Sequence, residues 1–162
     1  MVLIYHGTNL QKGLLIAEDK AILSNYQIKL KELKKTNKNY EQEFQMSIED
    51  LALFLASSTY AEREIEMRVK RFSITTDFKI ALGHANDYEN YHGGLILGIE
   101  TDEQYLSKLL RHSLNLSIFF VEDSLSLERL NEIHISPKAM GSFNLITDKF
   151  KNFNPKYLPI IK

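Results

Sequence analysis

The sequence predicts an α+β fold, because helical and extended patterns are mixed along its 162 residues without strict alternation. Short apolar runs of strand length are the first sign, and stripes of apolar residues at helical spacing are the second. No Pro-, Gly- or Ser-rich linker interrupts the chain. We therefore expect a single domain over residues 1–162, with a helical insert over about residues 24–60.

The composition narrows the class of protein. Hydrophobic residues make up 44% of the chain, charged residues 25%, and there is no cysteine, which excludes disulfides, thiol nucleophiles and thiolate metal sites. The net charge of −1 provides no global attraction to nucleic acid. Neither a secretory pattern nor a membrane-length apolar run is present in the sequence, so we expect a cytoplasmic location and no membrane partner.

The first predicted strand is also the first candidate site. Three apolar residues run into Tyr5, and the strand is expected to end there and turn away through Gly7. Such an end presents the His6 side chain, the Gly7 main chain and the Thr8 hydroxyl to one spot. Because Gly7 has no Cβ, the amide of a ligand could approach its main chain. The alternative is an ordinary strand end in which a backbone carbonyl pairs with His6.

The helical insert is expected to contain two helices. Ser24 is a candidate cap for a long helix through about Phe44, and Ser47 opens a capping box for a second. Lysines make the middle of the first helix basic over residues 29–38. This basic stretch is a solvated face, a nucleic-acid patch or a contact for an acidic partner.

The remainder of the chain continues the mixture of strands and helices. Alternation over 65–70 predicts a strand, Asp77 or Thr76 is expected to cap a helix, and Thr101 a later one that includes Leu110. Further strands are predicted at 93–99, 116–121 and 130–135, followed by a helix that starts at Ser136-Pro137. Period-two alternation places Glu132 and His134 on one strand face.

Three stretches, taken in order, resemble the motifs of the ADP-ribosyltransferases, a superfamily that includes diphtheria toxin and the poly(ADP-ribose) polymerases. They are Tyr5-His-Gly-Thr8, then Phe72-Ser-Ile-Thr-Thr-Asp77 with Ala81 downstream, and Asn131-Glu-Ile133. The resemblance implies two small packed β-sheets with NAD in the cleft between them. It also implies a mono-ADP-ribosyltransferase that uses NAD as substrate, needs no metal and is a possible toxin.

The resemblance further assigns roles to individual residues. His6 would bind a ribose hydroxyl and take part in catalysis, and the Gly7 main chain would clasp the nicotinamide amide. The remaining positions would contact or support the cofactor, with Thr8 near the adenosine ribose, Phe72 stacking on nicotinamide, and Ser73 or Thr75 donating hydrogen bonds.

Glu132 would be the catalytic carboxylate. Cleavage of the nicotinamide–ribose bond develops positive charge on the ribose, which a neighbouring carboxylate stabilises most in the transition state. Two positions depart from the family pattern. Arg68-Val-Lys-Arg71 replaces the usual glycines, and Leu130 stands where arginine-modifying toxins carry an acid. The acceptor, a protein or a nucleic acid, therefore stays open.

Other functions compete with this interpretation. One is an inactive module that binds NAD or ADP-ribose, and another is an RNA 2′-phosphotransferase. The latter would need the basic residues Arg68, Lys70, Arg71 and Arg111 around its cleft. A metal site is a further alternative, with ligands drawn from His84, His92, Glu132 and His134.

Overall fold

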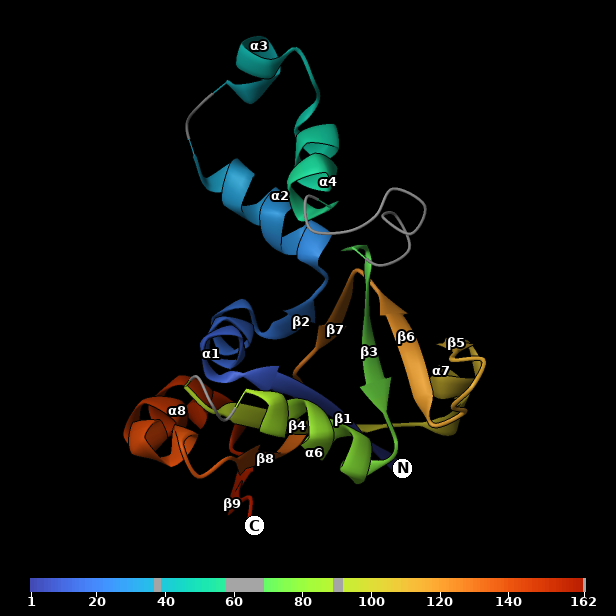
Figure 1. Cartoon of the computed structure of the whole chain (residues 1–162), viewed down its shortest axis with the longest axis vertical. Coiled ribbons are helices and arrows are strands. Elements are labelled where there is room, and N and C mark those ends of the chain that lie inside the picture. Colours follow the sequence, from blue (N-terminus) through green and yellow to red (C-terminus); the bar gives the residue numbers. More distant parts are fainter. Residues whose placement is uncertain (37–38, 58–68, 89–91, 162) are drawn as a thin grey trace. The chain divides into compact units, whose positions relative to one another are not determined.

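A computed structural model describes residues 1–36, 39–57, 69–88 and 92–161. The chain divides into two compact units, each of which is discontinuous in sequence. The first unit comprises Met1–Ile22, Ser73–Phe120 and Ser126–Lys162, and the second comprises Leu23–Phe72 and Val121–Leu125. The predicted α+β class is confirmed (Figure 1).

The strands form a sheet of seven and a sheet of two. The large sheet has the order β5-β6-β3-β1-β4-β8-β9, and β2 pairs with β7. The strand bounds are β1 Val2–Asn9, β2 Ala21–Leu23, β3 Arg71–Thr75, β4 Gly94–Thr101, β5 Leu110–Arg111, β6 Ile118–Glu122, β7 Ser124–Ser126, β8 Leu130–Ile135 and β9 Lys156–Pro159.

The helices lie between these strands in the sequence. Their bounds are α1 Leu10–Asp19, α2 Asn25–Lys35, α3 Tyr40–Phe44, α4 Ile48–Ser57, α6 Phe78–Asp87, α7 Glu103–Ser107 and α8 Phe143–Phe150. Two short 3₁₀ turns, η1 Ala139–Ser142 and η2 Lys151–Phe153, flank α8.

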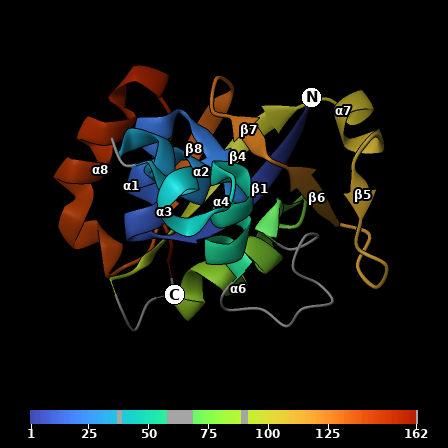
Figure 2. The same ribbon diagram turned by 90° about the horizontal axis from the view of Figure 1, so that it is seen from above.

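Strand β4 is the centre of the first unit, because helices cover both faces of the sheet there. Leu95, Ile96 and Leu97 are all fully buried, as expected of a strand that is apolar on both sides. On one face α1 approaches Leu95, where Gly13 leaves room for it, and α1 lies beside α8 (Figure 2). On the other face Ile96 packs in a cluster with Ala81 of α6.

Strand β1 is longer than the sequence predicts. It pairs with β4 from Val2↔Thr101 to Asn9↔Gly94, so the expected end at Tyr5 and turn at Gly7 are wrong. Gly7 is needed for another reason, since a Cβ there would come within 2.7 Å of the carbonyl oxygen of Ala81. The glycine therefore permits α6 to lie close to β1.

The insert contains three helices in its described part, where two were expected. Ser24 caps α2 as predicted, with its Oγ accepting from Gln27 N at 3.2 Å. The helix ends at Lys35 and does not continue to Phe44. Just past its end, the Thr36 hydroxyl donates to the carbonyl oxygen of Leu33. A polar residue that bonds to the backbone in this way competes with helix continuation. Ser47 caps α4 as predicted, accepting from Asp50 N at 3.1 Å.

Several other predictions concern helix caps. Asp77 caps α6 as predicted, by accepting from Lys79 N. Asp102 replaces Thr101 as the cap of α7, and that helix ends at Ser107, so Leu110 lies in β5 instead. Ser136 is followed by a 3₁₀ turn, where an α-helix was predicted.

Three of the predicted strands are present, and one observed strand was not predicted. The strands expected near 93–99, 116–121 and 130–135 are present as β4, β6 and β8. Strand β9, which pairs in parallel with β8, was not predicted. Residues 65–68 of the expected strand over 65–70 lie outside the described residues.

Candidate active site

His6 connects β1 to β3 at the point where the two strands stop pairing. In the described chain, β1 pairs with β3 only at Tyr5↔Thr75. One residue later, Nδ1 of the His6 ring lies 2.9 Å from the carbonyl oxygen of Ser73. A side chain thus makes the connection between β1 and β3 that a main-chain ladder makes elsewhere in the sheet.

The environment of His6 keeps its ring neutral. Burial is the main cause that lowers its pKa to about 4, the hydrogen bond to Ser73 opposes this, and the nearby charges of His84 and Lys12 add to the lowering. Because a carbonyl oxygen only accepts, Nδ1 must carry the proton and Nε2 is then the acceptor nitrogen. A neutral acceptor of this kind suits a hydroxyl group of a ligand.

Glu132 lies on β8 and leans across β4 toward β1. The register aligns it with Gly98, which in turn aligns with Tyr5. A Cβ on Gly98 would come within 2.6 Å of Glu132 Cγ and 3.2 Å of Oε1, so the carboxylate side chain occupies the space over this glycine. Burial, and secondly the negative charge of Glu132, raise the pKa of Tyr5.

The sheet register also determines which face each candidate residue occupies. Tyr5 and Glu132 share the face covered by α6, whereas His6 aligns with Leu97 on the opposite face. Side chains alternate along a strand, so His6 and Glu132 project from different faces of the sheet.

The other predicted site residues of β1 and β3 mainly contact neighbouring elements of the fold. Gly7 lies beneath α6, and Thr8 is buried beside Gly13 of α1. Ser73 provides the carbonyl oxygen that binds His6. The Thr75 side chain accepts a hydrogen bond from Asp77 N at 3.0 Å, so it supports the turn into α6.

Phe72 belongs to the second unit. It lies half-buried in β3, immediately before the residue at which the first unit resumes. Its proposed stacking on nicotinamide stays a prediction.

A pocket of about 280 Å³ opens at the carboxyl end of β1. Its lining mixes apolar and polar side chains, from Asn9, Leu10, Gln11, Tyr88 and His92. The Asn9 side chain also caps α1 by accepting from Lys12 N at 2.7 Å. The pocket is therefore continuous in sequence with the His6-Gly7-Thr8 stretch.

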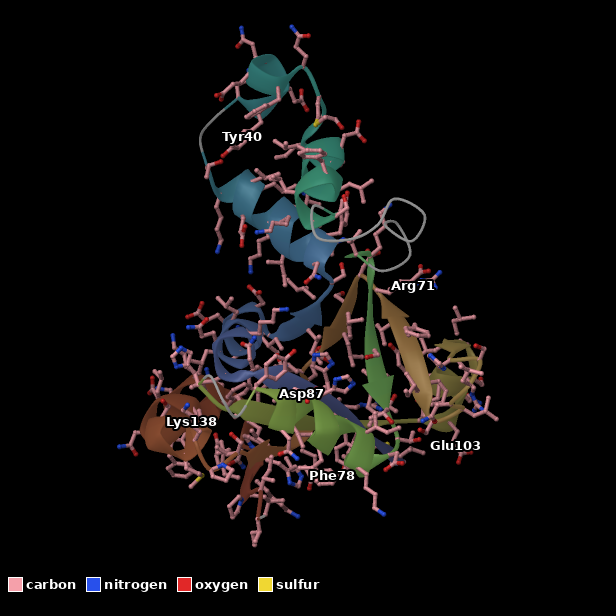
Figure 3. All side chains as sticks on the ribbon, viewed as in Figure 1. Tyr40, Arg71, Phe78, Asp87, Glu103 and Lys138 are labelled. Carbon is pink, nitrogen blue, oxygen red and sulfur yellow. The ribbon has the colours of Figure 1, made fainter. Side chains whose placement is uncertain are left out.

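The residues that sequence reasoning missed lie around Glu132. His134 Nε2 lies 2.8 Å from Glu132 Oε1, and the rings of Tyr5 and Phe78 pack against His134. Figure 3 shows Phe78 on α6. Alternation placed Glu132 and His134 on one face, which was the available signal, but nothing in the sequence identified Gly98 or Phe78 as their neighbours.

The fold of this chain is similar to that of DarT, an ADP-ribosyltransferase. DarT from Thermus sp. 2.9 in complex with ADP-ribosylated ssDNA has 11% sequence identity and a TM-score of 0.54, with 98% of this chain and 94% of that chain covered. The resemblance to ADP-ribosyltransferases found in the sequence is thus confirmed at the level of the fold.

Two further DarT structures give similar values. The complex with NAD+ has 12% identity and a TM-score of 0.53, covering 98% of this chain and 95% of DarT. The complex with carba-NAD+ has 13% identity and a TM-score of 0.51, covering 99% and 96%. Comparison with family models and with curated proteins found no match.

The alternatives gain little from the structure. Within the described ranges, no group of three or more His, Cys, Asp or Glu side chains is arranged to hold a metal ion.

The basic residues that an RNA 2′-phosphotransferase would need have other contacts. Lys70 lies over the Tyr26 ring, Arg71 pairs with Glu122, and Arg111 lies over Phe119. Arg68 is outside the described residues.

Described lysines of the basic stretch have local partners or local roles. Lys29 forms an ion pair with Glu32 at 3.2 Å, and Lys34 and Lys35 lie in the last turn of α2, where cations favour the helix dipole. The described part of this stretch gives no support for an acidic partner, and Lys38 lies outside it. Among the described helices, none is both long and apolar enough to span a bilayer.

Proposed function

We propose that this chain transfers ADP-ribose from NAD to an acceptor, with Glu132 as the catalytic carboxylate. The observation that carries the proposal is the arrangement around β1. Glu132 lies over Gly98 toward Tyr5 of β1, and a neutral His6 projects from the opposite face of the same strand beside Ser73 of β3. The similarity of the fold to DarT in complex with NAD+ supports the same choice of substrate.

NAD would bind along the edge of β1. His6 Nε2 accepts a hydrogen bond from a ribose hydroxyl, and the Gly7 main chain contacts the nicotinamide amide. The pocket at Asn9 and Leu10 has the mixed lining that an adenosine moiety needs, with Tyr88 and His92 on its rim.

The reaction replaces one bond to the anomeric carbon of the nicotinamide ribose by another. The bond to the pyridinium nitrogen breaks, and nicotinamide departs with the electron pair as a neutral molecule. Glu132 stabilises the positive charge that grows on the ribose. A nucleophilic atom of the acceptor then bonds to the same carbon and releases its proton to solvent or a nearby base.

A nucleic acid is the acceptor that we favour. DarT, the protein with the similar fold, is seen in complex with ADP-ribosylated ssDNA. The net charge of −1 implies that such binding depends on local contacts, since long-range attraction is weak.

Labelled NAD tests the proposal directly. The protein is incubated with NAD labelled in its adenylate phosphate, separately with single-stranded DNA, duplex DNA, RNA and a protein extract, and nicotinamide release is followed in parallel. We expect label on single-stranded DNA, and a loss of about 100-fold or more in rate for Glu132→Gln. Glu103→Gln, an exposed substitution on α7, is the matched control and should keep the full rate.

Three results would contradict the proposal in whole or in part. Release of no nicotinamide with any of these acceptors, despite NAD binding, would favour the inactive binding module. A full rate in Glu132→Gln would show that another group carries the chemistry. Label on protein alone would retain the transferase but overturn the nucleic-acid acceptor.

A further inference from the structure

Among the described residues, the carboxylate of Glu132 forms a hydrogen bond with the imidazole of His134. The Oε1–Nε2 distance is 2.8 Å, and the two side chains are only 16% and 14% exposed. A carboxylate oxygen accepts, so Nε2 of His134 carries the proton in this bond. A hydrogen bond to an ionised group in a largely buried place restricts where that group can lie.

The His134 ring is itself held by aromatic side chains from two other elements. The Phe78 ring of α6 lies 4.6 Å from it, centroid to centroid, at an interplanar angle of 55°. The Tyr5 ring of β1 lies 6.4 Å away at 73°, and Tyr5 and Phe78 pack edge to face at 5.2 Å. Rotation of His134 away from Glu132 would disturb these contacts, so the donor is fixed before any substrate binds.

Gly98 supplies the space that this arrangement needs. Any side chain at this position of β4 would overlap the Glu132 side chain, whose Cγ lies 2.6 Å from the site of a Cβ. The Glu132 side chain therefore lies directly over Gly98, and its carboxylate is hydrogen-bonded to His134. Both features direct it toward Tyr5 on β1.

We infer that His134 is a positioning residue that holds the Glu132 carboxylate in its reactive orientation over Gly98. This inference rests on the proposed transferase function, because it assigns His134 a role in the same site. Electrostatic stabilisation is most effective when the charged group is oriented before the reaction. His134 acts through Glu132 and does not touch the reacting atoms.

Two substitutions at one position separate this role from other roles. His134→Leu fills the space between the aromatic rings but removes the donor, whereas His134→Gln keeps an N–H donor at a similar reach and cannot act as a base. We expect His134→Leu to lower kcat for nicotinamide release by 10-fold or more, with KM for NAD unchanged. His134→Gln should recover most of the lost kcat, and thermal unfolding of both variants is measured to exclude a folding defect.

The pair should also behave as one unit. Adding His134→Leu to Glu132→Gln should lower kcat no further than Glu132→Gln alone, because residues that act together are not additive. A full kcat in His134→Leu would overturn the inference. A kcat in His134→Gln as low as that in His134→Leu would also overturn it, and would indicate proton transfer by the imidazole.

A measurement that needs no activity completes the test. The carboxyl ¹³C resonance of Glu132 should shift in His134→Leu and stay close to its wild-type position in His134→Gln. If it is the same in all three proteins, the bond does not hold in solution and the inference fails. If wild type releases no nicotinamide while the resonance shifts as expected, the proposed function fails and the positioning contact stands.

Discussion

Protonation of His6 should make the stability of this protein depend on pH. The pKa of His6 is about 4 in the folded chain, whereas an unperturbed histidine has a pKa of about 6.5. Between these values the unfolded chain binds a proton that the folded chain does not. The free energy of unfolding should therefore rise with pH across this window. The contribution of His6 to it should be lost as the pH falls from about 6.5 to 4.

The size of the effect follows from the same two values. The difference between 6.5 and about 4 corresponds to roughly 3 kcal/mol, with the full contribution present above pH 6.5. The main physical cause is burial of the ring, and the charges of His84 and Lys12 act in the same direction. The Ser73 carbonyl opposes them, because it also accepts from the charged ring.

Urea unfolding at a series of pH values from 4 to 7.5 measures this contribution, with His6→Asn as the reference. Asparagine places an amide N–H near the position of Nδ1, so the hydrogen bond to Ser73 is kept while the titrating group is removed. Other groups titrate in both proteins and cancel in the difference. The stability of wild type relative to His6→Asn should fall by roughly 3 kcal/mol as the pH decreases from 7 to 4.

A difference between the two proteins that does not change with pH would refute this reasoning. So would a His6 resonance that titrates near pH 6.5 in the folded protein. Either result would mean that water reaches the ring, and the argument that a neutral His6 accepts from a ribose hydroxyl would lose its basis.

Three further substitutions test the packing around the site. Gly7→Ala should destabilise the fold by roughly 1–3 kcal/mol in urea unfolding, because its Cβ would meet the backbone of α6 at 2.7 Å; unchanged stability would mean that α6 lies further from β1. Gly98→Ala should lower kcat for nicotinamide release at least 10-fold, because its Cβ would lie 2.6 Å from Glu132 Cγ and displace the carboxylate; full activity would contradict the placement of Glu132. Ser136→Ala should cost roughly 1–3 kcal/mol, because the buried Gly94 N–H loses its acceptor at 2.9 Å, and an unchanged melting temperature would count against this.

Local chemistry in the sequence was enough to predict most element types. The caps Ser24, Ser47 and Asp77 depend on a side chain three or fewer residues from its backbone partner, so they can be read without knowing the fold. The strand at 130–135 and the shared face of Glu132 and His134 follow from alternation alone. The three motif stretches and their order were sufficient for the ADP-ribosyltransferase resemblance.

Where prediction failed, the cause was a contact with a distant part of the chain. Strand β1 continues past Tyr5 because β4 pairs with it through Asn9, about ninety residues away. Gly7 looked like a turn residue, but its lack of a side chain is required by the packing of α6. Strand β9 pairs with β8, and no local sequence pattern predicts this pairing.

The sequence by itself determined the fold class and the helix caps Ser24, Ser47 and Asp77, because such caps depend on neighbours a few residues away, and its motifs supplied the candidate catalytic groups through the family resemblance. Only the tertiary structure decided that His6 and Glu132 project from opposite faces of the sheet, that Gly98 makes room for the carboxylate and that Phe78 holds His134 against it. These relations depend on strand register and helix packing. Pairing between distant segments fixes both, and the energies involved are spread over many contacts that have no local signature.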